Sequence, residues 1–456
     1  MLEKALLFYL EMIDSWIWGL PLIMLLVGTG LFLTIRLAGL QFRYLIYALK
    51  LAFFYKDKSS EGDISHFQAL MTALAATIGI GNIVGVATAV ATGGLGAIFW
   101  MWVTALLGMA TKYAEAILAI KYRVADKKGE MCGGPMYYLE RGAGFKKLAV
   151  MFALFGAIAA IGTGNMVQAH SVADAIHNLF GVSPWKTGLV LSICTGLVLL
   201  GGIKFIGRVT SLMVPLMALL YTFLGLGVIF YYFDRVPAAL YNIFSSAFTG
   251  QAASGGFIGS SILLAVRMGV SRGIFSNEAG LGSAPIVAAA AKTDLPGRQA
   301  MVSMVGTFCD TLVVCSITGL VIAVTGVLGQ YDQFGKVLDG APMTVAAFDS
   351  AIPGGKYVVT IGIILFAYST ILGWAYYGEK CTQYLFGLRS IMIYRVFFTF
   401  LILPGSAIGL KVIWALADIS NALMAIPNLL GILALSSVVI SETRVFLDVV
   451  QRERND

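Results

Sequence analysis

Long apolar segments recur along almost the whole chain of 456 residues. Most are about 20 residues or longer, which is the length that a helix needs to cross the hydrocarbon core of a bilayer. Lipid offers no hydrogen bonds to an irregular backbone, so such segments are stable as helices. We therefore predict an all-α integral membrane protein. We count eleven segments, at residues 16–37, 65–92, 94–120, 148–177, 186–203, 210–233, 260–290, 300–326, 355–379, 391–409 and 412–440.

The scarcity of charge supports this class. Charged residues make up 12% of the chain, whereas an ordinary soluble domain has about 25%. A soluble enzyme or a disordered chain of this length would need more polar surface. The five cysteines form no C-x-x-C pair and the three histidines are scattered, so neither a disulfide framework nor a metal centre is predicted. We expect the protein not to be an enzyme.

The basic residues predict an orientation. Alternate connections between the segments hold 22 of the 31 lysines and arginines, the opposite connections hold six, and Lys112, Arg267 and Arg272 lie inside segments. Because basic residues accumulate on the cytoplasmic side, we expect the N-terminus outside and the C-terminus in the cytoplasm of the cell (plasma, or inner) membrane. The same bias explains the net charge of +7 without a nucleic-acid partner.

Ten segments remain when the first is set aside, and they divide into two sets of five with opposite orientation. We predict an N-terminal transmembrane helix plus a cytoplasmic interfacial helix (residues 40–57) within 1–60, and a first five-helix repeat at 61–234. A second, inverted repeat with long outer loops at 235–258 and 327–354 would occupy 235–445, followed by a cytoplasmic tail at 446–456.

The first segment of each set is the most interrupted by glycine. The sequences are ATIGIGNIVG at 76–85 and RGIFSNEAGLG at 272–282. Corresponding broken helices in two inverted halves are a pointer to a transport site. A break leaves N–H groups that suit a carboxylate and C=O groups that suit an ammonium group or Na⁺. Asn82, Ser276 and Asn277 add side-chain oxygens. The alternative is that these glycines only allow close helix packing.

Other polar and bulky residues extend the candidate site. Gln168 could donate to a substrate carboxylate, or form only an interhelical hydrogen bond. Met166, Phe275 and Trp374 are candidate walls that would favour small amino acids, or ordinary core residues. We expect the site itself to be nearly free of fixed charge.

Charged residues inside the segments are expected to be structural or gating rather than substrate-binding. Lys112 and Glu115 are spaced to pair on one helix. Glu278 could accept N–H bonds at the second break. Asp310 and Asp418 have no partner nearby in the sequence.

Three stretches resemble the alanine/glycine:cation symporter (sodium:alanine symporter) family. They are GGLGAIFWMWVTALLG at 93–108, GGPMYYLERG at 133–142 and SNEAGLGSAP at 276–285. The resemblance covers nearly the whole chain. It implies a leucine-transporter-type 5+5 inverted repeat with one extra N-terminal helix. It further implies alternating-access import of alanine or glycine with Na⁺, or with H⁺, by a functional monomer in the lipid bilayer.

The resemblance also implies roles for individual residues. Thr77, Gly79, Gly81 and Asn82 are similar to the first broken core helix, whose backbone receives the substrate carboxylate. Gly273, Phe275, Ser276 and Asn277 resemble the sixth core helix, which covers the substrate. A sodium site would combine the carbonyls of Ala75 and Ile78 with the hydroxyls of Ser369 and Thr370. The alternative is that both hydroxyls bond only their own helix.

Rival functions remain at this stage. A symporter of another small zwitterion, such as a betaine, or of a nucleobase would use the same architecture. A channel would need a repeated filter loop, and a membrane enzyme would need clustered histidines or acids near one surface. The sequence favours neither of these last two classes.

Overall fold

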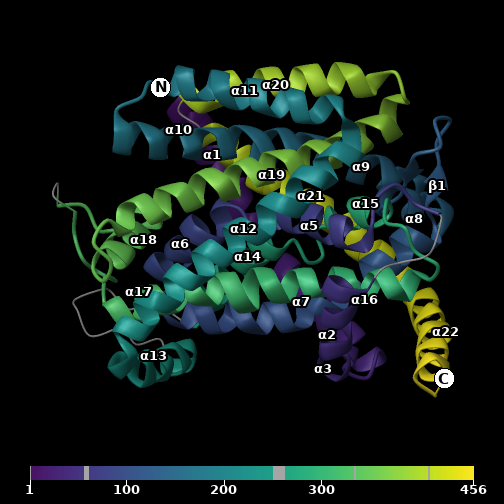
Figure 1. Cartoon of the computed structure of the whole chain (residues 1–456), viewed down its shortest axis with the longest axis horizontal. Helices are drawn as coiled ribbons and strands as arrows, with labels where there is room; N and C mark the ends of the chain where they lie inside the picture. The colour runs from purple at the N-terminus through teal and green to yellow at the C-terminus, as the bar shows by residue number, and fades with distance from the viewer. Residues whose placement is uncertain (1, 56–60, 250–261, 333–334, 409–410, 456) are drawn as a thin grey trace.

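The computed structural model describes residues 2–55, 61–249, 262–332, 335–408 and 411–455. Almost all of these residues are helical, and the one sheet is a short antiparallel hairpin of β1 (Val124–Ala125) and β2 (Met131–Cys132). Several long helices, among them α7 (Gly96–Lys121), α19 (Gly355–Phe386) and α20 (Ser390–Ala407), run roughly along the long axis of the molecule, whereas α2 (Leu20–Arg36) and α22 (Ser436–Asn455) run across it (Figure 1). The prediction of an all-α protein is confirmed.

The first half of the chain comprises the N-terminal part and the segment predicted to form the first repeat. In chain order these are α1 (Leu2–Ile17), α2 (Leu20–Arg36), α3 (Leu40–Arg43), α4 (Leu45–Phe54), α5 (His66–Thr77), η1 (Gly81–Gly85), α6 (Val86–Gly93), α7 (Gly96–Lys121), α8 (Pro135–Arg141), α9 (Lys146–Ile161), η2 (Gly162–Met166), α10 (Val167–Phe180), α11 (Pro184–Leu200) and α12 (Gly202–Tyr231).

The remaining helices follow in the part of the chain predicted to form the second repeat, its loops and the tail. They are η3 (Phe233–Arg235), α13 (Val236–Thr249), α14 (Ile262–Asn277), α15 (Ala284–Ala288), α16 (Pro296–Thr307), η4 (Phe308–Cys315), α17 (Ser316–Thr325), α18 (Gly340–Asp349), α19 (Gly355–Phe386), α20 (Ser390–Ala407), α21 (Lys411–Ala434) and α22 (Ser436–Asn455).

Eight helical stretches are long and apolar enough to cross a membrane, and the bent pair α5 and η1–α6 is a ninth candidate. The other two predicted spans, 186–203 and 260–290, correspond to the shorter α11 and to α14 with α15. The number eleven therefore stays a prediction. Residues 260, 261 and 409 of the predicted spans, 56–57 of the predicted interfacial helix and 250–258 of the first outer loop lie outside the described residues.

The first span differs from the prediction of a single helix at 16–37. Helix α1 already begins at Leu2, and the chain breaks at Trp18–Gly19 before α2. Gly19 is extended and Pro21 lies in the first turn of α2. Proline has no N–H to donate and favours the first turn of a helix, so it starts a new helix there.

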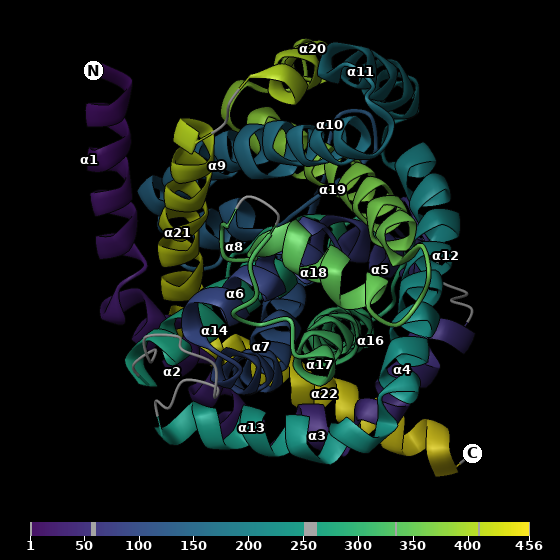
Figure 2. The same ribbon diagram turned by 90° about the vertical axis from the view of Figure 1, so that its left-hand side faces the viewer.

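The long outer loops also differ from expectation, because each contains a helix. Helix α13 follows the end of α12, and α18 precedes α19. Helix α18 packs on the first break, where the Thr344 hydroxyl donates to the Ile83 carbonyl at 3.1 Å. Figure 2 shows α18 near the centre of the bundle end that carries α13 and α17, while β1 and α8 lie at the other end in Figure 1.

Three π-helical turns interrupt the long helices of the core. They are η1 after the first break, η2 between α9 and α10, and η4 between α16 and α17. Such wide turns are rare and occur frequently at functional sites. Each of them carries a buried polar side chain: Asn82, Asn165 and Asp310.

Candidate functional site

The first break begins where α5 ends at Thr77, and the helix axis turns by 52° across it. Ile78 leaves the helical conformation with ψ at 88°. The Asn82 side chain crosses the gap, and its Oδ1 accepts a hydrogen bond from the Gly79 N–H at 2.9 Å. This bond satisfies one of the backbone groups that the break frees. The Thr77 hydroxyl donates to the Leu74 carbonyl of its own helix at 3.4 Å.

The second break follows α14, and its backbone is held from α7. Glu278, Gly280 and Gly282 all have positive φ, at 57°, 90° and 84°. Oε1 of Glu115 accepts hydrogen bonds from the Gly280 and Gly282 N–H groups, both at 3.1 Å. A third donor, Nδ2 of Asn428 on α21, lies 2.7 Å from the same oxygen. A buried carboxylate therefore takes over the bonds that a continuous helix would make.

One expectation about these charges is wrong and another holds only in part. Among the described residues Glu278 accepts no backbone N–H bond at the break: its Oε2 accepts from the Ser283 hydroxyl, and Glu115 holds the backbone. The charges of Lys112 and Glu115 act on one another, but Lys112 Nζ has no hydrogen-bond partner among the described residues. Both side chains are buried.

Asp310 joins the two broken helices. Its Oδ1 accepts from Nδ2 of Asn82 at 2.8 Å. Its Oδ2 accepts from the hydroxyls of Ser276 at 2.9 Å and of Thr311 at 2.7 Å. Asn277 reaches the same turn, with Nδ2 donating to the Thr311 hydroxyl at 3.0 Å. The expectation of a nearly uncharged site is therefore wrong. Sequence reasoning missed Asp310 because its partners lie 34 and 228 positions away.

The predicted sodium-site atoms converge between α5 and α19. The Ser369 hydroxyl lies 3.2 Å from the Ala75 carbonyl oxygen and 3.4 Å from that of Ile78. The Thr370 hydroxyl lies 3.1 Å from the Ala75 carbonyl oxygen. Both hydroxyls also lie within 3.0 Å of the Phe366 carbonyl of their own helix. The four oxygens are grouped as a small cation requires, although the within-helix bonds of the alternative are present too.

Other predicted residues meet at the first break. A Cβ built on Gly79 would lie 2.5 Å from Thr370 Oγ1 and 3.7 Å from Gln168 Oε1, so these two side chains face the bare backbone. A Cβ built on Gly81 would lie 3.4 Å from the Phe275 ring. Gln168 donates through Nε2 to the Thr163 carbonyl at 3.0 Å, and its Oε1 has no partner among the described residues. An amide oxygen and a phenyl ring thus border the break.

Three predicted substrate residues face other neighbours in this conformation. Gly273 lies against Met101 of α7, where a Cβ would be 3.5 Å from the Met101 Cα. Met166 packs against Gly405 of α20. Trp374 lies against Gly164, and its ring meets Tyr377 edge to face at 5.6 Å. Their contacts are those of packing residues, and a substrate role for them stays a prediction.

Two cavities lie beside the broken helices. One, of about 260 Å³, is lined by charged residues, and the other, of about 150 Å³, borders Gly81 and Val84. Arg272 and Phe275 line both cavities. Arg272 Nη1 lies 3.7 Å from Asp418 Oδ2, and the Phe275 ring stacks on Trp414 with 6.2 Å between centroids. Both contacts are made by residues of the cavity walls. The sequence held no signal for Trp414 as a neighbour of Phe275.

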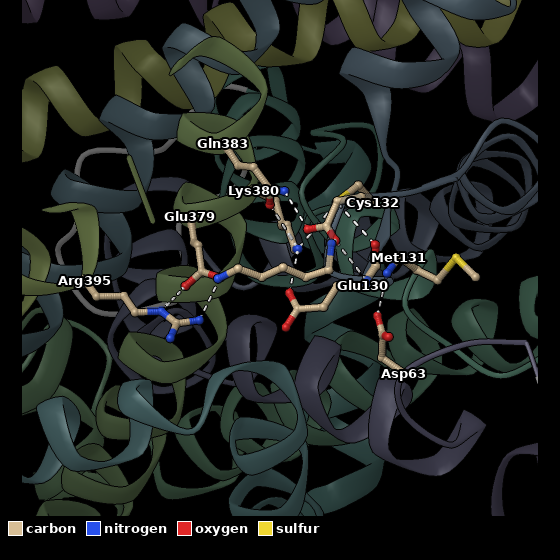
Figure 3. A network of polar contacts seen from close by, with 10 residues as sticks. Asp63, Glu130, Met131, Cys132, Glu379, Lys380, Gln383 and Arg395 are labelled. Atoms are coloured by element: carbon tan, nitrogen blue, oxygen red, sulfur yellow. Dashed lines mark hydrogen bonds and ion pairs between the residues drawn. The ribbon is translucent and has the colours of Figure 1, made fainter. Parts of the chain in front are cut away.

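The opposite end of the bundle is closed by the β1–β2 hairpin (Figure 3). Lys380 of α19 is 1% exposed. Its Nζ lies 3.4 Å from Glu130 Oε2 and 3.0 Å from Gln383 Oε1, and Gln383 donates to Asp126 at 3.0 Å. These contacts tie the hairpin to α19.

Further contacts strengthen this closure. Arg395 of α20 binds Glu379 through two hydrogen bonds, of 2.6 and 3.0 Å. Asp63, just before α5, accepts from the Met131 N–H at 2.8 Å. Burial raises the pKa of the Asp63 carboxyl, while this hydrogen bond lowers it. The hairpin therefore links α19 to the segment that leads into the first broken helix, as Figure 3 shows.

The chain matches known transporters over nearly its whole length. A model of the "Sodium:alanine symporter family" matches residues 3–456. The "Sodium/alanine symporter AgcS" of Methanococcus maripaludis is 57% identical over 449 residues, which cover 97% of each chain. The "Amino-acid carrier protein AlsT" of Bacillus subtilis is 35% identical, with 91% of this chain and 86% of AlsT covered.

A solved structure supports the fold. The crystal structure of MhsT in complex with L-phenylalanine superimposes with a TM-score of 0.62 at 17% identity, covering 84% of this chain and 93% of MhsT. MhsT has the leucine-transporter fold, so the predicted fold class is confirmed. The broken helices, the apolar spans and the match over residues 3–456 agree: the chain is a multi-pass membrane transporter that belongs to the sodium:alanine symporter family.

Proposed function

We propose that this symporter imports alanine or glycine together with Na⁺ by alternating access. One observation supports this most directly. Two broken helices meet at a buried polar centre, which borders a cavity and is closed at the other end by the hairpin. AgcS, which is named as a sodium/alanine symporter, is similar over the same length. Both together favour a small zwitterion and Na⁺ as the substrates.

The substrate carboxylate would bind at the start of η1, where the break frees backbone N–H groups and the positive end of the helix dipole lies. Gly79 and Gly81 have no side chains to block this approach, and Gln168 and Phe275 border it. The small cavity that Gly81, Phe275 and Trp414 line, about 150 Å³, favours alanine or glycine over larger amino acids.

The coupling Na⁺ would bind between the Ala75 and Ile78 carbonyls and the Ser369 and Thr370 hydroxyls. These oxygens already lie within 3.4 Å of one another in pairs. Carbonyls at the end of a broken helix hold Na⁺ in transporters of this architecture. Asp310 would supply a fixed negative charge to the site, so that the co-transported positive charge enters a favourable potential.

The remaining assignments concern the whole transporter. We place it in the cell membrane, with the N-terminus outside and the C-terminus in the cytoplasm, and take the monomer as the functional unit. The two halves would then correspond to residues 61–234 and 235–445. The broken helices would rock against the other helices between the conformation seen here and one open to the cytoplasm.

Uptake into proteoliposomes tests the proposal. Radiolabelled alanine should accumulate when an inward Na⁺ gradient is imposed, and an H⁺ gradient alone should drive much less uptake. Unlabelled alanine and glycine should compete, whereas a betaine or a nucleobase should not. Uptake that survives the collapse of both gradients would contradict symport.

Thr370→Val tests the ion site, because valine has the shape of threonine without the hydroxyl. The apparent Na⁺ affinity should fall about tenfold, the effect of losing roughly 1.4 kcal/mol of binding free energy. Thr360→Val on the same helix is the matched control, since the Thr360 hydroxyl donates to the Lys356 carbonyl of its own helix at 2.8 Å. Equal Na⁺ affinity in both variants would place the ion elsewhere.

A further inference from the structure

A cluster of buried charges at the second break holds more acid than base. Lys112 and Glu115 lie on α7, Glu278 follows α14, and Asp310 lies in η4. All four are at most 3% exposed. The charges that act on Lys112 are those of Glu278, Glu115 and Asp310. The charges of three carboxylates therefore act on one buried ammonium group.

Two of the carboxylates accept several hydrogen bonds. Glu115 Oε1 accepts three N–H groups, although its Oε2 has no partner among the described residues, and Asp310 accepts one amide and two hydroxyl groups. Several donors on one carboxylate favour its negative form. The Glu278 carboxyl group differs, since its only hydrogen bond found among the described residues is with the Ser283 hydroxyl, which can donate or accept.

The strained backbone at Glu278 raises the question of why a residue with a side chain occupies this position. Its φ of 57° lies in the left-handed region, which glycine adopts freely and other residues adopt rarely. Gly280 and Gly282 occupy the other left-handed positions of the same turn. A glycine at 278 would relieve the strain, so the turn does not require this carboxyl group.

Charge balance then assigns the proton. With every group ionised, Lys112 would balance one carboxylate and leave two negative charges among buried groups, where an uncompensated charge is very costly. If Glu278 is neutral, Lys112 balances Glu115 and one negative charge remains at Asp310. That charge matches one Na⁺ carried with one zwitterion. A second Na⁺ in place of the proton is the competing arrangement.

We propose that Glu278 is a proton-binding site and that the transporting form carries a proton there. The inference rests on the proposed Na⁺ symport of one zwitterion. Lys112 is 3% exposed, and its Nζ has no hydrogen-bond partner among the described residues. Within that part of the chain, its buried ammonium group therefore lacks a hydrogen-bond acceptor in this conformation. Further titratable groups that act on the cluster are the buried hydroxyls of Tyr138 on α8 and Tyr377 on α19. The Tyr377 hydroxyl likewise has no hydrogen-bond partner among the described residues.

Infrared difference spectra of the purified protein, recorded with Na⁺ and alanine at stepped pH, test the site without requiring transport. Wild type should show the C=O stretch of a protonated carboxyl group, and Glu278→Gln should lack it. Glu11→Gln, the same change at an exposed position of α1, should keep it. The absence of this band in wild type, or its persistence in Glu278→Gln, would overturn the proposal.

Uptake gives the second readout. Since the protonated form transports, wild-type uptake should be complete below the titration of Glu278 and fall about tenfold per pH unit above it. Glu278→Gln carries the hydrogen permanently, so its uptake should not fall over that range. If glutamine does not fold at this left-handed position, Glu278→Gly should give the same flat profile. A variant that follows the wild-type profile would overturn the proposal, whereas uptake independent of Na⁺ would instead contradict the symport on which it rests.

Discussion

Glycine at position 79 shows how one missing side chain shapes the site. The bare backbone lies against the Thr370 hydroxyl and near the Gln168 amide oxygen. It is thus a neighbour of both the proposed ion ligands and the proposed carboxylate site. The physical requirement here is close approach, since φ of Gly79 is not positive.

Gly79→Ala should therefore weaken both Na⁺ and alanine binding. The added methyl group would lie 2.5 Å from Thr370 Oγ1 and force it to move, at a cost of about 1–3 kcal/mol. Gly227→Ala on α12 is the control, since a Cβ there meets no atom within 4 Å. Equilibrium binding of labelled alanine at several Na⁺ concentrations measures both effects. Equal affinities in the two variants would contradict this arrangement.

Asp310 marks the limit of residue-level prediction. Its position inside a span showed that it needed partners, because a charge at mid-membrane is costly. Its partners Asn82 and Ser276 had been assigned to the site for other reasons, from the glycine-rich breaks. Only the folded chain brings all three together, since contacts across 228 positions leave no local pattern.

At the scale of elements, the hairpin of β1 and β2 acts as a closure rather than a connection. It occupies one end of the bundle and contacts α19 and the segment before α5. Arg123, just before β1, also contacts the turn after α15, where its Nη1 donates to the Ala291 carbonyl at 2.8 Å. A pathway to that end must break these contacts. The buried Lys380 is central to them because it binds both Glu130 and Gln383.

Lys380→Met should loosen this closure. Glu130 would lose its cation, and a loss of about 1–2 kcal/mol would raise the open population about 5–30-fold. Cys132, which is 1% exposed, reports the opening. Its rate of alkylation by a maleimide should rise accordingly in a protein whose other cysteines are alanine.

Lys146→Met is the matched control for this measurement. Lys146 also faces a glutamate, Glu140, at 3.6 Å, but its side chain is 76% exposed, so its loss should change little. Equal alkylation rates in the Lys380 and Lys146 variants would show that Lys380 does not hold the hairpin closed.

Elements differ in how well their sequence predicts them. The spans were predicted because hydropathy adds up over 20 residues, and the two breaks because glycine interrupts them. Helices α13 and α18 were missed because their segments were read only as long outer loops. The break at Gly19 was missed because the apolar character continues across it from Leu6 to Arg36.

For the whole molecule, Figure 1 shows the N- and C-terminal ends of the chain towards opposite ends of the bundle. An odd number of crossings produces this arrangement, and eleven is such a number. The hairpin, α8 and α22 lie at the end that holds most basic residues, and α13 and α18 at the other. The orientation proposed from the basic residues is therefore compatible with the architecture.

Cysteine labelling in intact cells tests this orientation. Tyr331→Cys, exposed before α18, should react with a membrane-impermeant maleimide added outside. Ser441→Cys, exposed on α22, should react only after the membrane is permeabilised. Both cysteines are introduced into a variant that lacks the exposed Cys194. The reverse pattern would invert the topology.

The three π turns have a consequence for how the chain can be altered. A π turn holds one residue more than the α-turn it replaces, so η2 and η4 amount to single-residue insertions within otherwise regular helices, whereas η1 opens the helix that follows the first break. Removing one residue from η2 would restore an ordinary helix and turn everything beyond it by about 100°. Gln168 would then leave the first break although no side chain had been changed. At these turns the length of the chain, as much as its composition, encodes the site.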